Sequence, residues 1–287
     1  MSAADPVPAI AEADATGELA ALYQDIRVTL NVPFVNLVWR HLATIPGALP
    51  WTWASVRPLY ALPLFDDAAD ALARVPELDV AVEPCLPDAL QLVGIDASQQ
   101  RQIGSLLADY GHANARALLA LLAAGARLAD SAACRTPPAQ AVAGAASVPG
   151  VRGTRVPGAH LALPGLDALS PAMLQVIRTL NSYGQIADTA IVGSLYRHLA
   201  HWPGFLALAC TALAQPQRGG VLQAAVRRTL GDAQVAARQL PLPDVDAGAL
   251  EPTARAAAMA SLAAFTSQAI SRMVVMGYAM QRLLPPP

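Results

Sequence analysis

Two segments decide the fold of this chain: Val35–Gly47, VNLVWRHLATIPG, and Val192–Gly204, VGSLYRHLAHWPG. They share a leading Val, the run Arg-His-Leu-Ala and a closing Pro-Gly, and they align Trp39 with Tyr196. Composition alone would give about one identity over such a length. The chain therefore contains an internal duplication, in which Arg40 of the first copy corresponds to Arg197 of the second, at an offset of 157.

A second match lies upstream, where Asp25-Ile26-Arg27 aligns with Val176-Ile177-Arg178 at an offset of 151. The two offsets differ by six, which places a six-residue insertion in the second copy, within 181–190. A helix-start signal precedes each match, Thr16 in the first copy and Ser170-Pro171 in the second. Ser and Thr are favoured as the residue that caps a helix, and Pro is favoured at the first helical position. The second copy was thus altered locally between these two segments.

The composition favours helices throughout, since Ala and Leu dominate the apolar residues and no run alternates with the period of a strand. The predicted class is all-α: two tandem helical repeats that form an intramolecular pseudo-dimer. The boundaries that we expect are a first repeat over 1–134, a Pro/Gly/Ala-rich linker over 135–169 and a second repeat over 170–287. Helices are predicted near 16–30, 36–45, 48–61, 63–74 and 96–128, then near 170–181, 190–201, 204–214, 218–239 and 253–284, with loops at 75–88 and 240–246. Fused duplications recreate a dimer interface within one chain, so a ligand cavity is expected where the repeats meet.

Charge and composition exclude several functional classes. All 19 basic residues are Arg and none is Lys, which removes Schiff-base chemistry and P-loop phosphate binding. These arginines are scattered, so no nucleic-acid partner is expected. Arginines also interrupt the longest apolar runs, and the N-terminus lacks a signal-peptide pattern, so we expect no membrane partner and a cytoplasmic location. Three distant cysteines, Cys85, Cys134 and Cys210, predict buried thiols, with no metal site and no cofactor.

Several motifs resemble one known family. Thr16-Gly17-Glu18, Tyr23 through Leu30, Val32-Pro33-Phe34, Leu42-Ala43-Thr44 and Pro46-Gly47 look like the opening of the group I 2-haloacid dehalogenases. Tyr110-Gly111 resembles the middle segment of that family, and Ser194 with Leu199-Ala200 and Trp202-Pro203 its second repeat. The resemblance spans nearly the whole chain and implies a duplicated all-α fold.

The resemblance also implies a reaction, the removal of halide from short 2-haloalkanoic acids by direct attack of water. In the family an Asp of the second repeat activates that water and an Asn of the first repeat helps to hold it. Carried over to this chain, the Asp position is Leu195, the Asn position is His112, and a nearby Tyr position is Ala115. The implied substrate-binding residues are Phe34, Leu37, Gly193, Ser194 and Leu195.

Because Leu195 cannot accept a proton, two other residues are candidates for the base. His112 is one, since imidazole titrates near neutrality; its alternative is a structural histidine at the repeat interface. Asp188 is the other, since it would lie two turns before Leu195 if the helix extended that far; its alternative is a helix N-cap. His41 and His198 recur in both copies, which favours a packing role over catalysis, and the Trp residues are expected in the core.

The hypothesis from sequence is a 2-haloacid-dehalogenase-like protein that binds a short organic or halogenated acid between its repeats. It would be a hydrolase of carbon–halogen bonds if His112 or Asp188 activates water. The alternative is a diverged member that binds a small molecule, or runs a different acid–base reaction, without dehalogenase activity. The natural substrate, its stereochemistry and further assembly into a homodimer are left open.

Overall fold

The structure is a computed structural model of the chain, and it describes residues 6–133, 158, 160–242 and 250–285. Within these ranges it is all-α, with no strand. The first repeat contains α1 (Gly17–Leu30), α2 (Leu37–Leu42), α3 (Ala48–Val56), α4 (Pro63–Leu72), α5 (Glu77–Ala81), α6 (Pro87–Leu92) and α7 (Ala97–Ala133). The second contains α8 (Pro171–Ser182), α9 (Ser194–Leu199), α10 (Pro203–Ala212), α11 (Ala214–Arg218), α12 (Val221–Ala237), α13 (Pro252–Ala264) and α14 (Ser271–Arg282).

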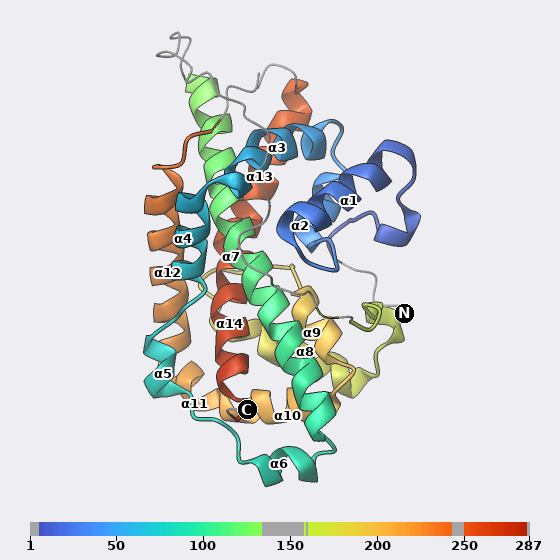
Figure 1. Cartoon of the computed structure of the whole chain (residues 1–287), viewed down its shortest axis with the longest axis vertical. Helices are drawn as coiled ribbons and strands as arrows, with labels where there is room; N and C mark the ends of the chain where they lie inside the picture. The colour runs from blue at the N-terminus through green and yellow to red at the C-terminus, as the bar shows by residue number, and fades with distance from the viewer. Residues whose placement is uncertain (1–5, 134–157, 159, 243–249, 286–287) are drawn as a thin grey trace.

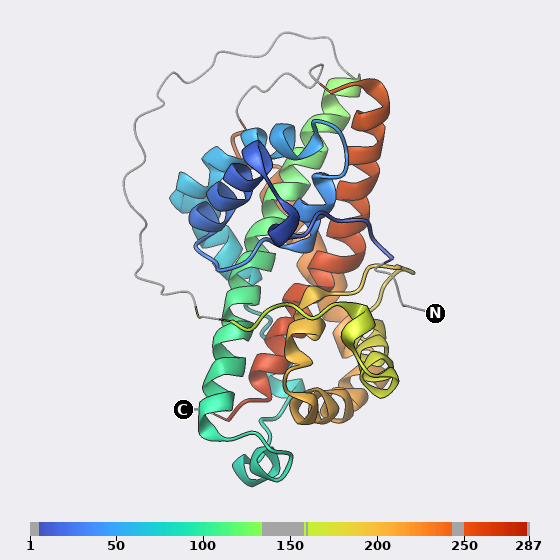
Figure 2. The same cartoon turned by 90° about the vertical axis from the view of Figure 1, so that its right-hand side faces the viewer.

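Two long helical tracts form the centre of the molecule. The tract α7 runs antiparallel to the tract formed by α13, a π-helical turn at Phe265–Ile270, and α14 (Figure 1). The blue helices α1–α3 cover one end of this pair, and the yellow and orange helices α8–α11 lie near its other end (Figure 2). The two repeats therefore share one apolar core rather than folding as separate bodies.

Local sequence signals explain several helix starts. Ser170 Oγ accepts a hydrogen bond from Met173 N at 3.2 Å, and Pro171 occupies the first helical position. Asp96 and Gln99 form the reciprocal capping pair at the start of α7, with bonds of 2.8 and 2.9 Å. Thr16 does precede α1, but its side chain makes no capping bond.

Three expectations about elements are wrong in detail. The predicted helix over 190–201 begins only at Ser194, because the Asn181 side chain holds the preceding residues through Ile191 O and Gly193 N. The predicted loop over 75–88 contains α5 and also the start of the short helix α6, which begins at Pro87. The tract predicted over 218–239 breaks at Gly220, which has a positive φ of 74°.

The linker boundaries at 135 and 169 stay a prediction, since 134–157 and 159, including Cys134, lie outside the described residues. The described end of the linker is bound to both repeats. Asp109 Oδ2 of α7 accepts from Gly158 N at 3.1 Å and also pairs with the His160 ring, while His201 of the second repeat donates to Ala162 O at 2.8 Å. None of the helices in the described ranges combines the length and the apolar character that a membrane crossing requires.

Candidate active site

The motif repeated in both copies joins each repeat to the other. The Tyr110 hydroxyl of α7 lies 2.7 Å from His198 Nδ1 of α9. In the other direction His41 Nε2 of α2 lies 2.9 Å from Ser261 Oγ of α13, and its ring lies 5.3 Å from that of Phe265. The two histidines thus make cross-repeat contacts from equivalent positions, as a packing role predicts.

The predicted site residue Phe34 belongs to this junction. Its ring stacks on Tyr110 with centroids 4.4 Å apart and lies 6.2 Å from the ring of His198. Burial lowers the pKa of His198 to about 4, so the imidazole is neutral and can accept the Tyr110 hydroxyl proton at Nδ1. Burial in turn raises the pKa of Tyr110, so the phenol keeps its proton. This part of the interface is therefore neutral and aromatic.

A buried pair of amides lies between α2 and α7, and the sequence reasoning missed it. Asn36 Nδ2 donates to Asn114 Oδ1 at 3.1 Å, and both residues are almost fully buried. Asn36 Oδ1 and Asn114 Nδ2 make no further hydrogen bond. An unused acceptor beside an unused donor can hold a water or a small polar ligand. The available signal was that Asn114 is only two residues from the position assigned to the water-holding Asn.

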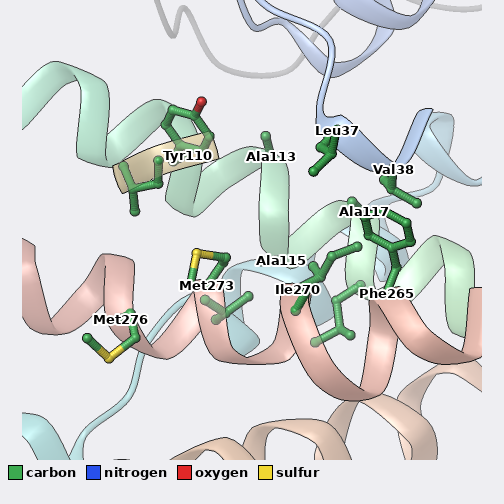
Figure 3. Close-up of a cluster of buried hydrophobic side chains, with 14 of the residues drawn as sticks. Leu37, Val38, Tyr110, Ala113, Ala115, Ala117, Phe265, Ile270, Met273 and Met276 are labelled. Atoms are coloured by element: carbon green, nitrogen blue, oxygen red, sulfur yellow. The ribbon is translucent and has the colours of Figure 1, made fainter. Parts of the chain in front are cut away.

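The remaining predicted binding residues lie at the starts of α2 and α9, against the central tracts. Leu37 points toward α7 near Ala113 and Ala117 (Figure 3). Gly193 has no room for a side chain, since a Cβ there would lie 2.4 Å from Met273 Sδ. Leu195 is fully buried, and its Cδ2 would lie 3.8 Å from a Cβ placed at Gly277 of α14. Ser194 is buried beside it, and its Oγ has no partner.

His112 lies on another face of α7. Its Nε2 is 3.0 Å from the carbonyl oxygen of Leu30, which can only accept, so Nε2 carries the proton and Nδ1 carries the lone pair. Burial first and the nearby Arg116 second lower its pKa to about 4. Asn114 is two residues further, about 200° around the helix, so the two side chains leave α7 in nearly opposite directions.

Asp188 lies in an exposed, non-helical segment. The expectation that it shares a helical face with Leu195 is wrong, because α9 begins six residues after it, at Ser194. The Asn181 bonds to Ile191 and Gly193 hold that segment extended.

A buried arginine occupies the corresponding region of the second repeat. Arg272, in the first turn of α14, is 1% exposed, and its NH2 donates to Asn181 Oδ1 at 3.0 Å. The same oxygen accepts from Gly193 N at 3.3 Å. Arg272 thus contacts the segment that leads into Ser194 and Leu195. The sequence reasoning used Arg272 only as a break in an apolar run, although an isolated Arg in such a run was itself a signal.

A cavity lies away from these residues. It is an open groove of about 940 Å³ between the start of α7 and the end of α14, whose polar lining residues include Gln100, Arg101, Tyr278 and Arg282. It is contributed by both repeats, yet none of the predicted site residues lines it. This groove is therefore separate from the predicted site. Among the described residues no group of three His, Cys, Asp or Glu side chains could hold a metal ion.

Comparison with known proteins points to one group. No protein-family model matches the sequence. The chain is 27% identical, over 73% of its length and 69% of the relative, to a configuration-inverting 2-haloacid dehalogenase from Alcaligenes xylosoxydans xylosoxydans. It is 33% identical, over 34% of its length and 35% of the relative, to an (R)-2-haloacid dehalogenase from Pseudomonas putida.

Solved structures show the same architecture. A mutant of D-2-haloacid dehalogenase superposes with a TM-score of 0.78 at 18% identity, covering 97% of this chain and 96% of the other. A mutant complex with D-2-CPA and a complex of the dehalogenase with L-LA give the same score and coverage, at 19% and 18% identity. At these identities the structures establish the fold alone. The chain thus shares the all-α fold of D-2-haloacid dehalogenase and is similar in sequence to 2-haloacid dehalogenases.

Proposed function

We propose that this protein binds a short 2-haloalkanoic acid, or a close analogue, where its two repeats meet, and that it hydrolyses the carbon–halogen bond slowly by direct attack of water. The relatives are named for this class of substrate, and one solved neighbour is a complex with D-2-CPA. The family resemblance leads us to expect both binding of the acid and hydrolysis. The contacts within this chain support the binding best.

The observation that carries the proposal is the buried amide pair. Asn36 and Asn114 come from two elements of the first repeat and leave one acceptor and one donor unused within an apolar interface. A buried polar atom without a partner costs about 1–3 kcal/mol, so a water or a polar ligand held there recovers that energy. The unpartnered Ser194 Oγ of the second repeat adds a further polar atom among the predicted binding residues.

In this proposal His112 is the base that activates water. Its pKa of about 4 is close to that of an ordinary Asp, so its basicity matches that of the carboxylate that the family uses, and it is unprotonated at neutral pH. Its direction away from Asn114 means that the amide pair does not hold the water that His112 would activate. This separation is the reason to expect slow hydrolysis.

The fully buried Leu195 favours the second candidate, binding without dehalogenation. If Leu195 occupies the place of the family's Asp, the chain has lost the group that generates the nucleophile, and losing such a base typically costs 10²–10⁴-fold in rate. The protein would then keep the acid-binding interface and use it for another purpose.

Halide release from both enantiomers of 2-chloropropionate separates the candidates. We expect slow release by the wild type, lost in His112→Ala and unchanged in Asp188→Asn, whose side chain is exposed and serves as the matched control. Release that neither substitution affects would remove both residues as bases. If no halide is released but the acid still binds in calorimetry, the second candidate is correct.

A further inference from the structure

Arg272 is a buried cation with a single hydrogen-bonding partner among the residues that the structure describes. The side chain is 1% exposed, only its NH2 is bonded, and Nε and NH1 have no partner. Arginine carries five N–H donors and keeps its charge in proteins, so at least the three donors on Nε and NH1 remain unused. The acceptor Asn181 Oδ1 belongs to a neutral amide and leaves the positive charge uncompensated.

Such a group is costly to bury. Moving a charge out of water carries a penalty of several kcal/mol unless an opposite charge and hydrogen bonds offset it. Burial lowers the pKa of Arg272. Among the described groups Tyr196 acts against this shift, but burial raises the pKa of its own phenol, which stays neutral and supplies no compensating charge. Water could bond to the free N–H groups, but it could not neutralise the charge. The arginine therefore has the properties of a binding site for an anion.

The first repeat has a different side chain at the place that corresponds to the Asn181–Arg272 contact. Leu30 and Asn181 are equivalent by the upstream offset of 151, and each is contacted by a polar side chain of a central tract. In the first repeat this side chain is His112, which is neutral and bonded to the Leu30 carbonyl. In the second repeat it is a cation without a carboxylate. The six-residue insertion also falls in the segment that begins at Asn181, so both changes concentrate at this place.

Beside Arg272, the buried Ser194 hydroxyl has no partner among the described residues, whereas the N–H groups of Gly184 and Gly193 are already bonded. Gly184, with a positive φ of 66°, brings backbone against the arginine stem, and a Cβ there would lie 3.6 Å from Arg272 Cγ. Gly193 donates to the same Asn181 oxygen as Arg272 does, and Ser194, the next residue, has a buried hydroxyl without a partner. A Cβ at either glycine would meet a neighbouring side chain, Met273 Sδ at 2.4 Å from Gly193 and Val226 Cγ2 at 3.3 Å from Gly184, so the two glycines allow close packing there.

We propose that Arg272, with the Ser194 hydroxyl, binds the carboxylate of the small acid, while Asn181 holds the guanidinium in place. The inference rests on the proposed function, because it names the group that anchors that acid. A guanidinium matches a carboxylate in geometry and charge, and two N–H donors can bond to its two oxygens. The recognised class is a short monocarboxylate, and a neutral amide of the same shape is rejected.

The test is a binding measurement that needs no turnover. 2-Chloropropionate, acetate and 2-chloropropionamide are titrated into the full chain by calorimetry at constant ionic strength. We expect the wild type to bind both carboxylates and not the amide. Arg272→Met should weaken carboxylate binding roughly 10- to 100-fold, the value of one charge-assisted pair of hydrogen bonds, and Arg272→Lys should bind with intermediate affinity.

A stability readout separates a ligand anchor from a structural arginine. Without ligand, Arg272→Met should melt no lower than the wild type, since an uncompensated charge is removed. The matched control is Arg116→Met: Arg116 is also buried but pairs with Asp66 and Asp70, so its loss should lower the melting temperature. If Arg272→Met is destabilised like the control, fails to fold, or binds acetate as the wild type does, the proposal is overturned.

The acetate titration keeps this inference distinct from the proposed function. Acetate carries the carboxylate but no halogen, so it reports on Arg272 whether or not the protein releases halide. Acetate binding that depends on Arg272 without halide release supports the anchor and refutes the hydrolysis. Halide release by Arg272→Met at the wild-type rate and KM supports the hydrolysis and refutes the anchor.

Discussion

The substitution Leu195→Asp tests the reaction that the family resemblance leads us to expect. It places a carboxyl group at the fully buried start of α9, where the family resemblance puts the water-activating Asp. Nothing else in the described region is changed. If the interface around Leu195 keeps the ancestral geometry, the variant should gain halide release or raise it by about 10²–10⁴-fold, the usual value of a positioned general base.

The same change has a calculable cost in stability. Removing a buried Leu loses about 1.5–3 kcal/mol of burial energy, and a carboxyl group in an apolar site adds about 1–3 kcal/mol even when it is neutral. The expected loss in the free energy of unfolding is therefore about 3–6 kcal/mol. A domain whose total stability is toward the upper end of about 5–15 kcal/mol stays folded after such a loss. Urea unfolding followed by circular dichroism measures it.

Two further features sharpen this experiment. Burial raises the pKa of an introduced carboxyl, so the folded state holds its proton to higher pH than the unfolded state does. The stability of the variant should then fall as pH rises above about 4, while its halide release, which needs the ionised form, should rise. Val38→Asp is the matched control, because Val38 is the buried equivalent of Leu195 in the first repeat. A folded Leu195→Asp that releases no more halide than Val38→Asp would refute the reasoning.

Two more predictions concern the junction between the repeats. Tyr110→Phe removes the hydroxyl that bonds to His198 Nδ1 and should lower the free energy of unfolding in urea by about 1–3 kcal/mol. Tyr60→Phe removes a buried hydroxyl that has no partner among the described residues and should cost nothing. Equal effects of the two substitutions would contradict the hydrogen bond between Tyr110 and His198. His112 and His198 both have pKa values lowered to about 4, so the unfolded state takes up protons first, and stability present above pH 6.5 is lost as pH falls toward 4. Each should cost about 2 kcal/mol between pH 7 and pH 5, and unfolding at the two pH values, compared with His112→Gln, checks it.

The sequence predicted the architecture because the signals for it are local or repeated. The duplicated segment, the Ala- and Leu-rich tracts and the cap at Ser170 predicted the helices and their pairing, and the structure confirms an all-α pseudo-dimer. The start of α9 was misplaced because it depends on the Asn181 side chain, twelve residues before Gly193. No pattern along the chain marks such a contact.

The site was harder to predict because its polar groups meet across elements. Phe34, Leu37, Gly193, Ser194 and Leu195 were reached through the family resemblance, and their catalytic or binding roles stay predictions. The amide pair Asn36–Asn114 joins residues 78 positions apart, and Asn181–Arg272 joins residues 91 apart. Both are recognisable only once the helices are packed, because burial is what makes an unpartnered polar atom significant.

Joining the two copies in one chain has a consequence for what the interface can contain. In an assembly of two identical subunits, every substitution near the two-fold axis is made twice, so one buried cation would bring its own copy nearby. Within a single polypeptide the halves can change independently. Here a neutral imidazole contacts Leu30 in the first copy, and a guanidinium contacts the equivalent residue Asn181 in the second. Covalent fusion thus permits the two halves to differ in charge at equivalent places, which two identical subunits could not do.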